Sequence, residues 1–123
     1  MRQRRKAREV AMQVLYGLDV SQGSLPEAVD LFWQNFEAPE KVKAFSSDLV
    51  TGTWQNVQQI DALLGSCADN WSVERMSRVD RSILLMAVYE LLHCHDIPPK
   101  VAINEAINLS KLFGSENSST IIN

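Results

Sequence analysis

The chain has 123 residues, enough for one domain that buries roughly two thirds of its unfolded surface and folds without disulfide or metal support. It carries 12 basic residues, 15 acidic residues and only two cysteines. Two cysteines exclude a disulfide framework and favour a reducing compartment, and no apolar run is long enough for a signal peptide or a membrane span, so we expect a cytoplasmic protein without membrane contact.

The apolar spacing predicts helices, and no alternating strand pattern competes with it. The first helix is expected over about 3–20 and the second over about 25–36, after which Pro39 interrupts the chain. A long third helix is expected over about 40–65. Gly52 lies inside it, at a cost of about 1 kcal/mol relative to alanine, which predicts a close helix crossing there.

The fourth main helix is expected over about 78–94, and its middle is apolar nearly all the way round, which is typical of a central buried helix. A short segment around 71–76, with Ser72 as its cap, precedes it. The fifth helix begins near Pro99 and continues to Gly114. These elements predict a compact all-α domain.

The start of the first helix is unusually basic. Removing the five cations among the first eight residues leaves seven basic residues against 15 acidic ones, a net charge of −8 over residues 9–123. Cations at a helix N-terminus oppose the macrodipole, at a cost of up to about 1 kcal/mol each, so a purely structural helix would sooner begin with acids. The pattern favours polyanion binding, and a solvated basic tail is the alternative. The five cations are Arg2, Arg4, Arg5, Lys6 and Arg8.

Residues that could carry chemistry are few. His93 and His95 lie two positions apart, so on a helix they point nearly opposite ways and cannot share one metal ion, and Asp96 adds only a second ligand for His93. Glu90 and Glu105 lie on mostly apolar helices. We expect both to be structural acids, bonded to backbone amides or to a tyrosine hydroxyl, rather than a buried acid pair for acid–base work. No Gly-rich phosphate loop or nucleophile elbow is present, so we expect no metal, no cofactor and no catalysis.

Three blocks, in order along the chain, resemble the NusB family of bacterial transcription antitermination factors. They are Arg4–Glu9 with Gln13–Tyr16, then Val79–Leu91, and the more specific Ile97–Gly114. The resemblance implies an all-helical domain of two subdomains, here about 1–66 and about 67–123. It also implies that the last helix is truncated at residue 123.

The resemblance implies a function without catalysis. Family members bind a single-stranded boxA element of ribosomal RNA transcripts together with NusE, a ribosomal protein, as part of an RNA polymerase antitermination complex. Two alternatives stay open, namely the RNA-binding domain of a ribosomal RNA cytosine methyltransferase and a protein-interaction module. Family members also differ in whether they form a homodimer.

Carried over by position, the resemblance assigns RNA contact to Arg4, Arg5, Lys6 and Arg8, with Tyr16 as a contact or a support. Arg4 and Arg8 are one turn apart and rank first, Arg5 next and Lys6 last. Four phosphate contacts on a single strand predict a slope of about −3 for log affinity against log salt concentration.

Two further regions follow from the resemblance. The segment after Gly114 would face RNA through Asn117 and Ser118, although Thr120 and Ile121 stand where the family often has a basic and an aromatic residue. The partner surface for NusE would include Asp80 and Glu74.

Overall fold

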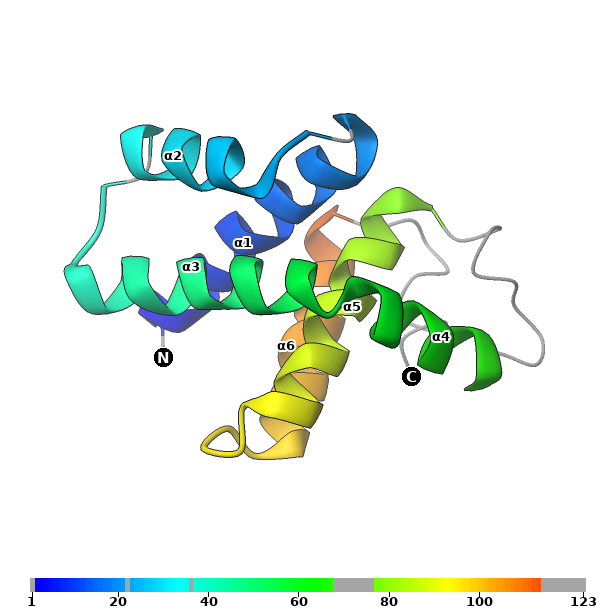
Figure 1. Cartoon of the computed structure of the whole chain (residues 1–123). Helices are drawn as coiled ribbons and strands as arrows, with labels where there is room; N and C mark the ends of the chain where they lie inside the picture. The colour runs from blue at the N-terminus through cyan, green and yellow to red at the C-terminus, as the bar shows by residue number, and fades with distance from the viewer. Residues whose placement is uncertain (1, 22, 36, 68–76, 114–123) are drawn as a thin grey trace.

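The computed structural model describes residues 2–21, 23–35, 37–67 and 77–113, and within these ranges it contains six helices and no strand (Figure 1). The expected all-α fold is therefore confirmed. The helices are α1 (Arg2–Ser21), α2 (Leu25–Asn35), α3 (Glu40–Gln55), α4 (Val57–Cys67), α5 (Arg78–His93) and α6 (Pro99–Phe113). None of these helices is both long enough and apolar enough to cross a membrane.

Helix α1 lies inside the arrangement, packed against α2, α3 and α5, while α5 and α6 run side by side as a pair (Figure 1). The prediction that the helix starting near residue 78 is central is confirmed, because α5 also contacts α3 and α4. One buried apolar cluster joins α1, α3, α5 and α6. The cluster consists of Ala11, Met12, Leu15, Leu18, Leu49, Val50, Ile83, Met86, Ala87, Ala106 and Leu109. The division of the chain into two subdomains stays a prediction.

The prediction of one long third helix over 40–65 is wrong, because the chain forms two helices there that meet at Asn56. The side-chain amide of Asn56 donates to the carbonyl oxygen of Gly52 at 2.7 Å. Its backbone N–H donates to the carbonyls of Gly52 and Thr53, both at 3.2 Å. A local side-chain bond of this kind competes with the helical ladder, so α3 ends and α4 begins in a new direction.

The close crossing expected at Gly52 is confirmed. A Cβ atom built at this position would collide with the ring and hydroxyl of Tyr89 on α5, whereas one built at Gly65 would meet nothing within 4 Å. The glycine therefore lets α3 approach α5 more closely than any other residue would allow.

The starts of α5 and α6 follow local sequence signals. Ser77 caps α5, since its Oγ accepts a hydrogen bond from the backbone N–H of Asp80 at 3.1 Å. Pro99 is the first residue of α6, as expected. The expected cap at Ser72 lies outside the described residues.

Candidate nucleic-acid interface

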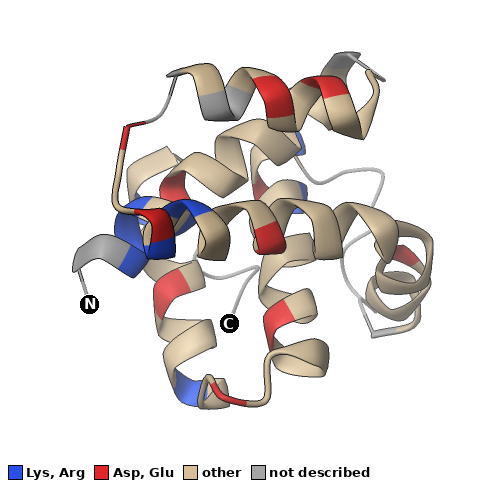
Figure 2. Cartoon of the chain, turned by 60° about the vertical axis from the view of Figure 1, so that its left-hand side comes forward, with Lys and Arg blue, Asp and Glu red and all other residues tan. Residues whose placement is uncertain are grey.

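The basic start of α1 lies at one end of the molecule, beside the N-terminus (Figure 2). Arg4, Arg5 and Lys6 are exposed there, as a site for a polyanion requires. Arg8 is not, because only 3% of it is accessible to solvent. The helix start therefore divides into an exposed group of three cations and one buried cation.

Arg8 forms a buried ion pair with Glu90 of α5, which is only 2% exposed. One carboxylate oxygen of Glu90 accepts from Arg8 Nη2 at 2.7 Å and from Nε at 3.0 Å. Burial raises the pKa of the Glu90 carboxyl, and the hydrogen bonds and charge of Arg8 oppose that rise. We expected Glu90 to bond backbone groups or a tyrosine hydroxyl, and its partner is instead Arg8. The burial of Arg8 also does not fit its predicted rank as a first RNA contact.

Arg4 has no carboxylate partner among the described residues. Its guanidinium lies over the ring of Phe45 on α3, 4.8 Å from the ring centroid, and the guanidinium of Arg8 is 5.2 Å from the same centroid. Such cation–π contacts orient a guanidinium without using its N–H donors. Arg4 thus keeps its full set of donors for a ligand.

Arg5 and Lys6 are paired, but at the surface. Arg5 donates to both carboxylate oxygens of Glu105 on α6, at 3.2 and 3.3 Å, and this bond corrects the expectation that Glu105 pairs with backbone groups. Lys6 Nζ lies 3.6 Å from the carboxylate of Glu9. More than half of each basic side chain is exposed. An exposed pair such as that of Lys6 contributes only about 0–1 kcal/mol, so Lys6 can turn to a phosphate at small cost. Arg5 uses only part of its five N–H donors on Glu105 and can bind a phosphate with the others.

Tyr16 is 39% exposed, which leaves its ring partly available for stacking. It follows Arg5 by 11 positions, which places it on nearly the same face of α1, about 16 Å along the axis. Asn117 and Ser118 lie outside the described residues, as do Thr120 and Ile121.

The structure does not support the predicted exposure of Asp80 at a partner surface. Asp80 is 2% exposed, and its Oδ1 has no hydrogen-bond partner in the described part of the chain. A buried carboxylate cannot face a partner protein directly, so the exposed role expected for Asp80 does not fit. Glu74 lies outside the described residues.

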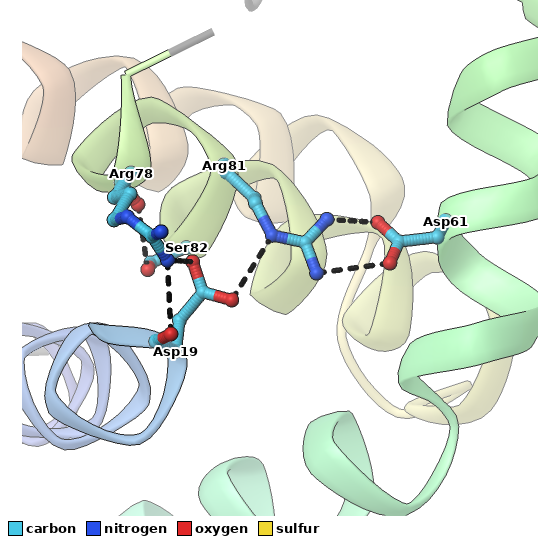
Figure 3. A network of polar contacts seen from close by, with 5 residues as sticks. All are labelled: Asp19, Asp61, Arg78, Arg81 and Ser82. Carbon is cyan, nitrogen blue, oxygen red and sulfur yellow. Dashed lines mark hydrogen bonds and ion pairs between the residues drawn. The ribbon is translucent and has the colours of Figure 1, made fainter. Parts of the chain in front are cut away.

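An ion-pair network that the sequence did not reveal fixes the other end of α1 (Figure 3). Asp19 accepts from Arg81 Nε at 3.3 Å and from Arg78 at 3.4 Å, and its backbone carbonyl accepts from Arg78 at 2.9 Å. Arg81 also donates to both carboxylate oxygens of Asp61 on α4. Ion pairs therefore hold α1 near both of its ends and fix how its basic start is presented.

The histidines lie at the end of α5, where a solvated helix C-terminus was expected. His93 is exposed, is the last residue of the helix and stacks on Tyr89 with ring centroids 5.3 Å apart. Throughout the described ranges, no group of three or more His, Cys, Asp or Glu side chains is placed to hold a metal ion.

The buried pair had a sequence signal that the composition argument missed. Arg8, Met12 and Leu15 follow one another at helical spacing, and all three are buried. Glu90 continues the buried stripe of Ile83 and Met86 on α5 in the same way. A base and an acid, each on the core stripe of its helix, predict a buried pair.

The fold and the basic start of α1 define an all-helical domain of a kind suited to binding polyanions. A model described as the NusB family matches residues 5–123. The chain is 57% identical to the transcription antitermination protein NusB of Syntrophus aciditrophicus (strain SB), over its whole length and 76% of the relative. It is 46% identical to the protein of that name from Desulforapulum autotrophicum, over its whole length and 87% of the relative.

Two solved structures agree with these matches. T. maritima NusB superposes with a TM-score of 0.86 and 30% identity, over 97% of this chain and 84% of that one. A structure of the antitermination factors NusB and NusE with double-stranded RNA superposes with a TM-score of 0.86 and 22% identity, over 99% of this chain and 91% of that one, and supports the fold.

The chain belongs to the NusB family of transcription antitermination proteins. The prediction that it is not an enzyme is confirmed, since the relatives that it matches over its whole length are transcription antitermination proteins.

Proposed function

We propose that this antitermination factor binds a single-stranded, boxA-like segment of ribosomal RNA transcripts through the start of α1. Arg4 is the first contact, because it is exposed and has no carboxylate partner among the described residues. Arg5 adds a contact through the guanidinium donors that its pair with Glu105 leaves free, and Lys6 adds one by exchanging its weak surface pair with Glu9 for a phosphate. Arg8 holds the helix start on α5 and positions the other three cations.

Tyr16, further along the same helix, offers a ring on which an unpaired base can stack. Asn117 and Ser118 keep the RNA-facing role that the family resemblance implies. Three phosphate contacts in place of four lower the expected salt slope from about −3 to about −2. The single observation that carries the proposal is the guanidinium of Arg4, which is exposed and has no carboxylate partner among the described residues, in a chain of the NusB family.

The partners we propose are the ribosomal protein NusE and, through it, an RNA polymerase antitermination complex in the cytoplasm. A solved structure of related factors contains both NusE and RNA, which supports this assembly. An acidic chain with net charge −3 suits a basic ribosomal protein. Self-association through the same helix end is the alternative use of this surface. Light scattering with and without RNA separates the two uses, since a dimer that masks the site dissociates when RNA is added.

The proposal is tested by titrating a labelled single-stranded boxA RNA with the chain and with Arg4→Ala plus Lys6→Ala. We expect the double variant to bind roughly 10- to 100-fold more weakly, because two charge-assisted contacts are lost. Lys100→Glu, at an exposed position on α6 outside the ion-pair network, lowers the net charge by the same two units and serves as the control. Equal weakening by both variants would reduce the effect to net charge and would contradict the assigned site.

A further inference from the structure

A polar groove lies beside the basic start of α1, between that helix and α6. It is an open groove with a volume of about 440 Å³, within the range of about 300–1,000 Å³ in which proteins bind small organic groups. Arg5 forms one wall, and the facing wall is a stripe of α6 residues at helical spacing. The α6 residues of that stripe are Val101, Asn104, Asn108 and Lys111, with Glu105 and Ile107 beside them.

This stripe is separate from the face that α6 gives to the core. Ala102, Ala106 and Leu109 are buried against the other helices. Asn104 is exposed and Asn108 is half-buried. Neither side-chain amide has a hydrogen-bond partner among the described residues. Two such amides, one turn apart and without a partner in the described part of the chain, offer both donors and acceptors to a ligand.

The charge of the groove favours a nucleobase in its centre and phosphates at its rim. The carboxylate of Glu105, which lines the groove, is neutralised by Arg5, which binds both of its oxygens. Lys111 is exposed at one end of the stripe, and Arg5 retains exposed surface at the other side. A neutral centre lined by amides suits the edge of a base, whereas the flanking cations suit the backbone that carries it.

We infer that this groove takes one unpaired base of the RNA strand, with Asn104 and Asn108 hydrogen-bonded to the base edge and with Arg5 and Lys111 at the flanking phosphates. The inference rests on the proposed RNA-binding function and adds a base-reading subsite to it. Adenine is the expected base, because its edge presents a hydrogen-bond donor beside an acceptor, and a single asparagine amide can bond both. The basic helix start then supplies affinity, and the groove supplies sequence preference.

The test uses the full chain and three labelled RNA 12-mers of adenine, cytosine and uracil. We expect the wild-type chain to prefer adenine by roughly 5- to 100-fold. Asn104→Ala plus Asn108→Ala should bring the three affinities together without changing the salt slope. Gln58→Ala plus Gln59→Ala, which removes two exposed amides from α4, is the control and should keep the preference.

The outcomes separate this inference from the function on which it rests. If the wild-type chain binds none of the RNAs, the proposed function fails. If it binds them through Arg4 and Lys6 with no base preference, or with a preference that the asparagine variant keeps, the groove assignment alone is overturned. If the Asn104→Ala plus Asn108→Ala variant no longer binds NusE but keeps the RNA preference, the groove assignment is also overturned and the groove is a protein contact. Should the double variant not fold, each single substitution carries the same test.

Discussion

Removing the guanidinium of Arg8 should destabilise the fold far more than removing a surface charge. The Arg8–Glu90 pair is 2–3% exposed and is held by hydrogen bonds of 2.7 and 3.0 Å. Arg8→Met leaves the carboxylate of Glu90 buried without a counter-charge, and breaking such a pair costs about 3–5 kcal/mol. Since a domain is stable by only about 5–15 kcal/mol, this loss is a large share of the total.

The assay is urea unfolding followed by far-UV circular dichroism at neutral pH, with the double variant Arg8→Met plus Glu90→Leu beside the single one. Replacing both charges by apolar groups of similar size is often neutral or stabilising, so the double variant should recover most of the loss. A single variant that costs less than about 1 kcal/mol, as for an exposed pair, would refute the reasoning. So would a double variant no more stable than Arg8→Met.

The same variant has a predicted pH dependence. Burial already raises the pKa of Glu90 above its ordinary value of 4.5, and loss of Arg8 removes the groups that oppose the rise. The folded Arg8→Met chain then binds a proton more tightly than the unfolded chain does. Its free energy of unfolding should therefore recover as the pH falls from the raised folded pKa toward 4.5, and be lost again as the pH rises.

Three further predictions follow from the packing. Gly52→Ala should destabilise the chain by about 1–3 kcal/mol because the new methyl group collides with a ring, whereas Gly65→Ala should be neutral or stabilising by up to about 1 kcal/mol. Arg81→Met should lower the free energy of unfolding by about 1.5–3 kcal/mol, because its bonds to two carboxylates are lost. Arg78→Met should lower it by less than about 1 kcal/mol, because the Arg78 side chain is 56% exposed. Burial and nearby carboxylates raise the pKa of the Cys94 thiol, so iodoacetamide should alkylate it more slowly than a free cysteine at mildly alkaline pH.

Each of these predictions has its own check. Urea unfolding measures the glycine and arginine variants, and equal costs within either pair would contradict the packing described. Mass spectrometry follows alkylation in a Cys67→Ser background, so that only Cys94 reacts. Labelling of Cys94 at the rate of a free thiol, before unfolding, would contradict its raised pKa.

Much of the fold follows from the sequence because apolar periodicity and proline positions act locally. The helix starts at Leu25 and Pro99 and the close approach at Gly52 were predicted from such signals. The break between α3 and α4 was not, because the apolar face continues across Asn56, and the break coincides with a local side-chain hydrogen bond from Asn56 to Gly52 that no periodicity reveals.

The candidate site was harder to predict because exposure depends on tertiary contacts. Arg4 and Arg8 are one turn apart, yet Arg4 is exposed over Phe45 and Arg8 is buried against Glu90. The partner of Arg8 is 82 positions away, and that of Arg5 is 100 positions away. Charge counts find the cluster, but only the packing of α5 and α6 against α1 shows which cations are available.

The central claim is that the exposed cations at the start of α1 neutralise RNA phosphates, and the salt dependence of RNA binding tests it most directly. Affinities for single-stranded boxA RNA are measured over a series of salt concentrations for the wild-type chain and for Arg4→Ala plus Lys6→Ala. The slope of log affinity against log salt concentration should be about −2 for the three cations of the helix start, or about −3 when Lys111 adds a fourth contact, and should become shallower by about 1.4 in the variant. A slope that the two substitutions leave unchanged would contradict the claim.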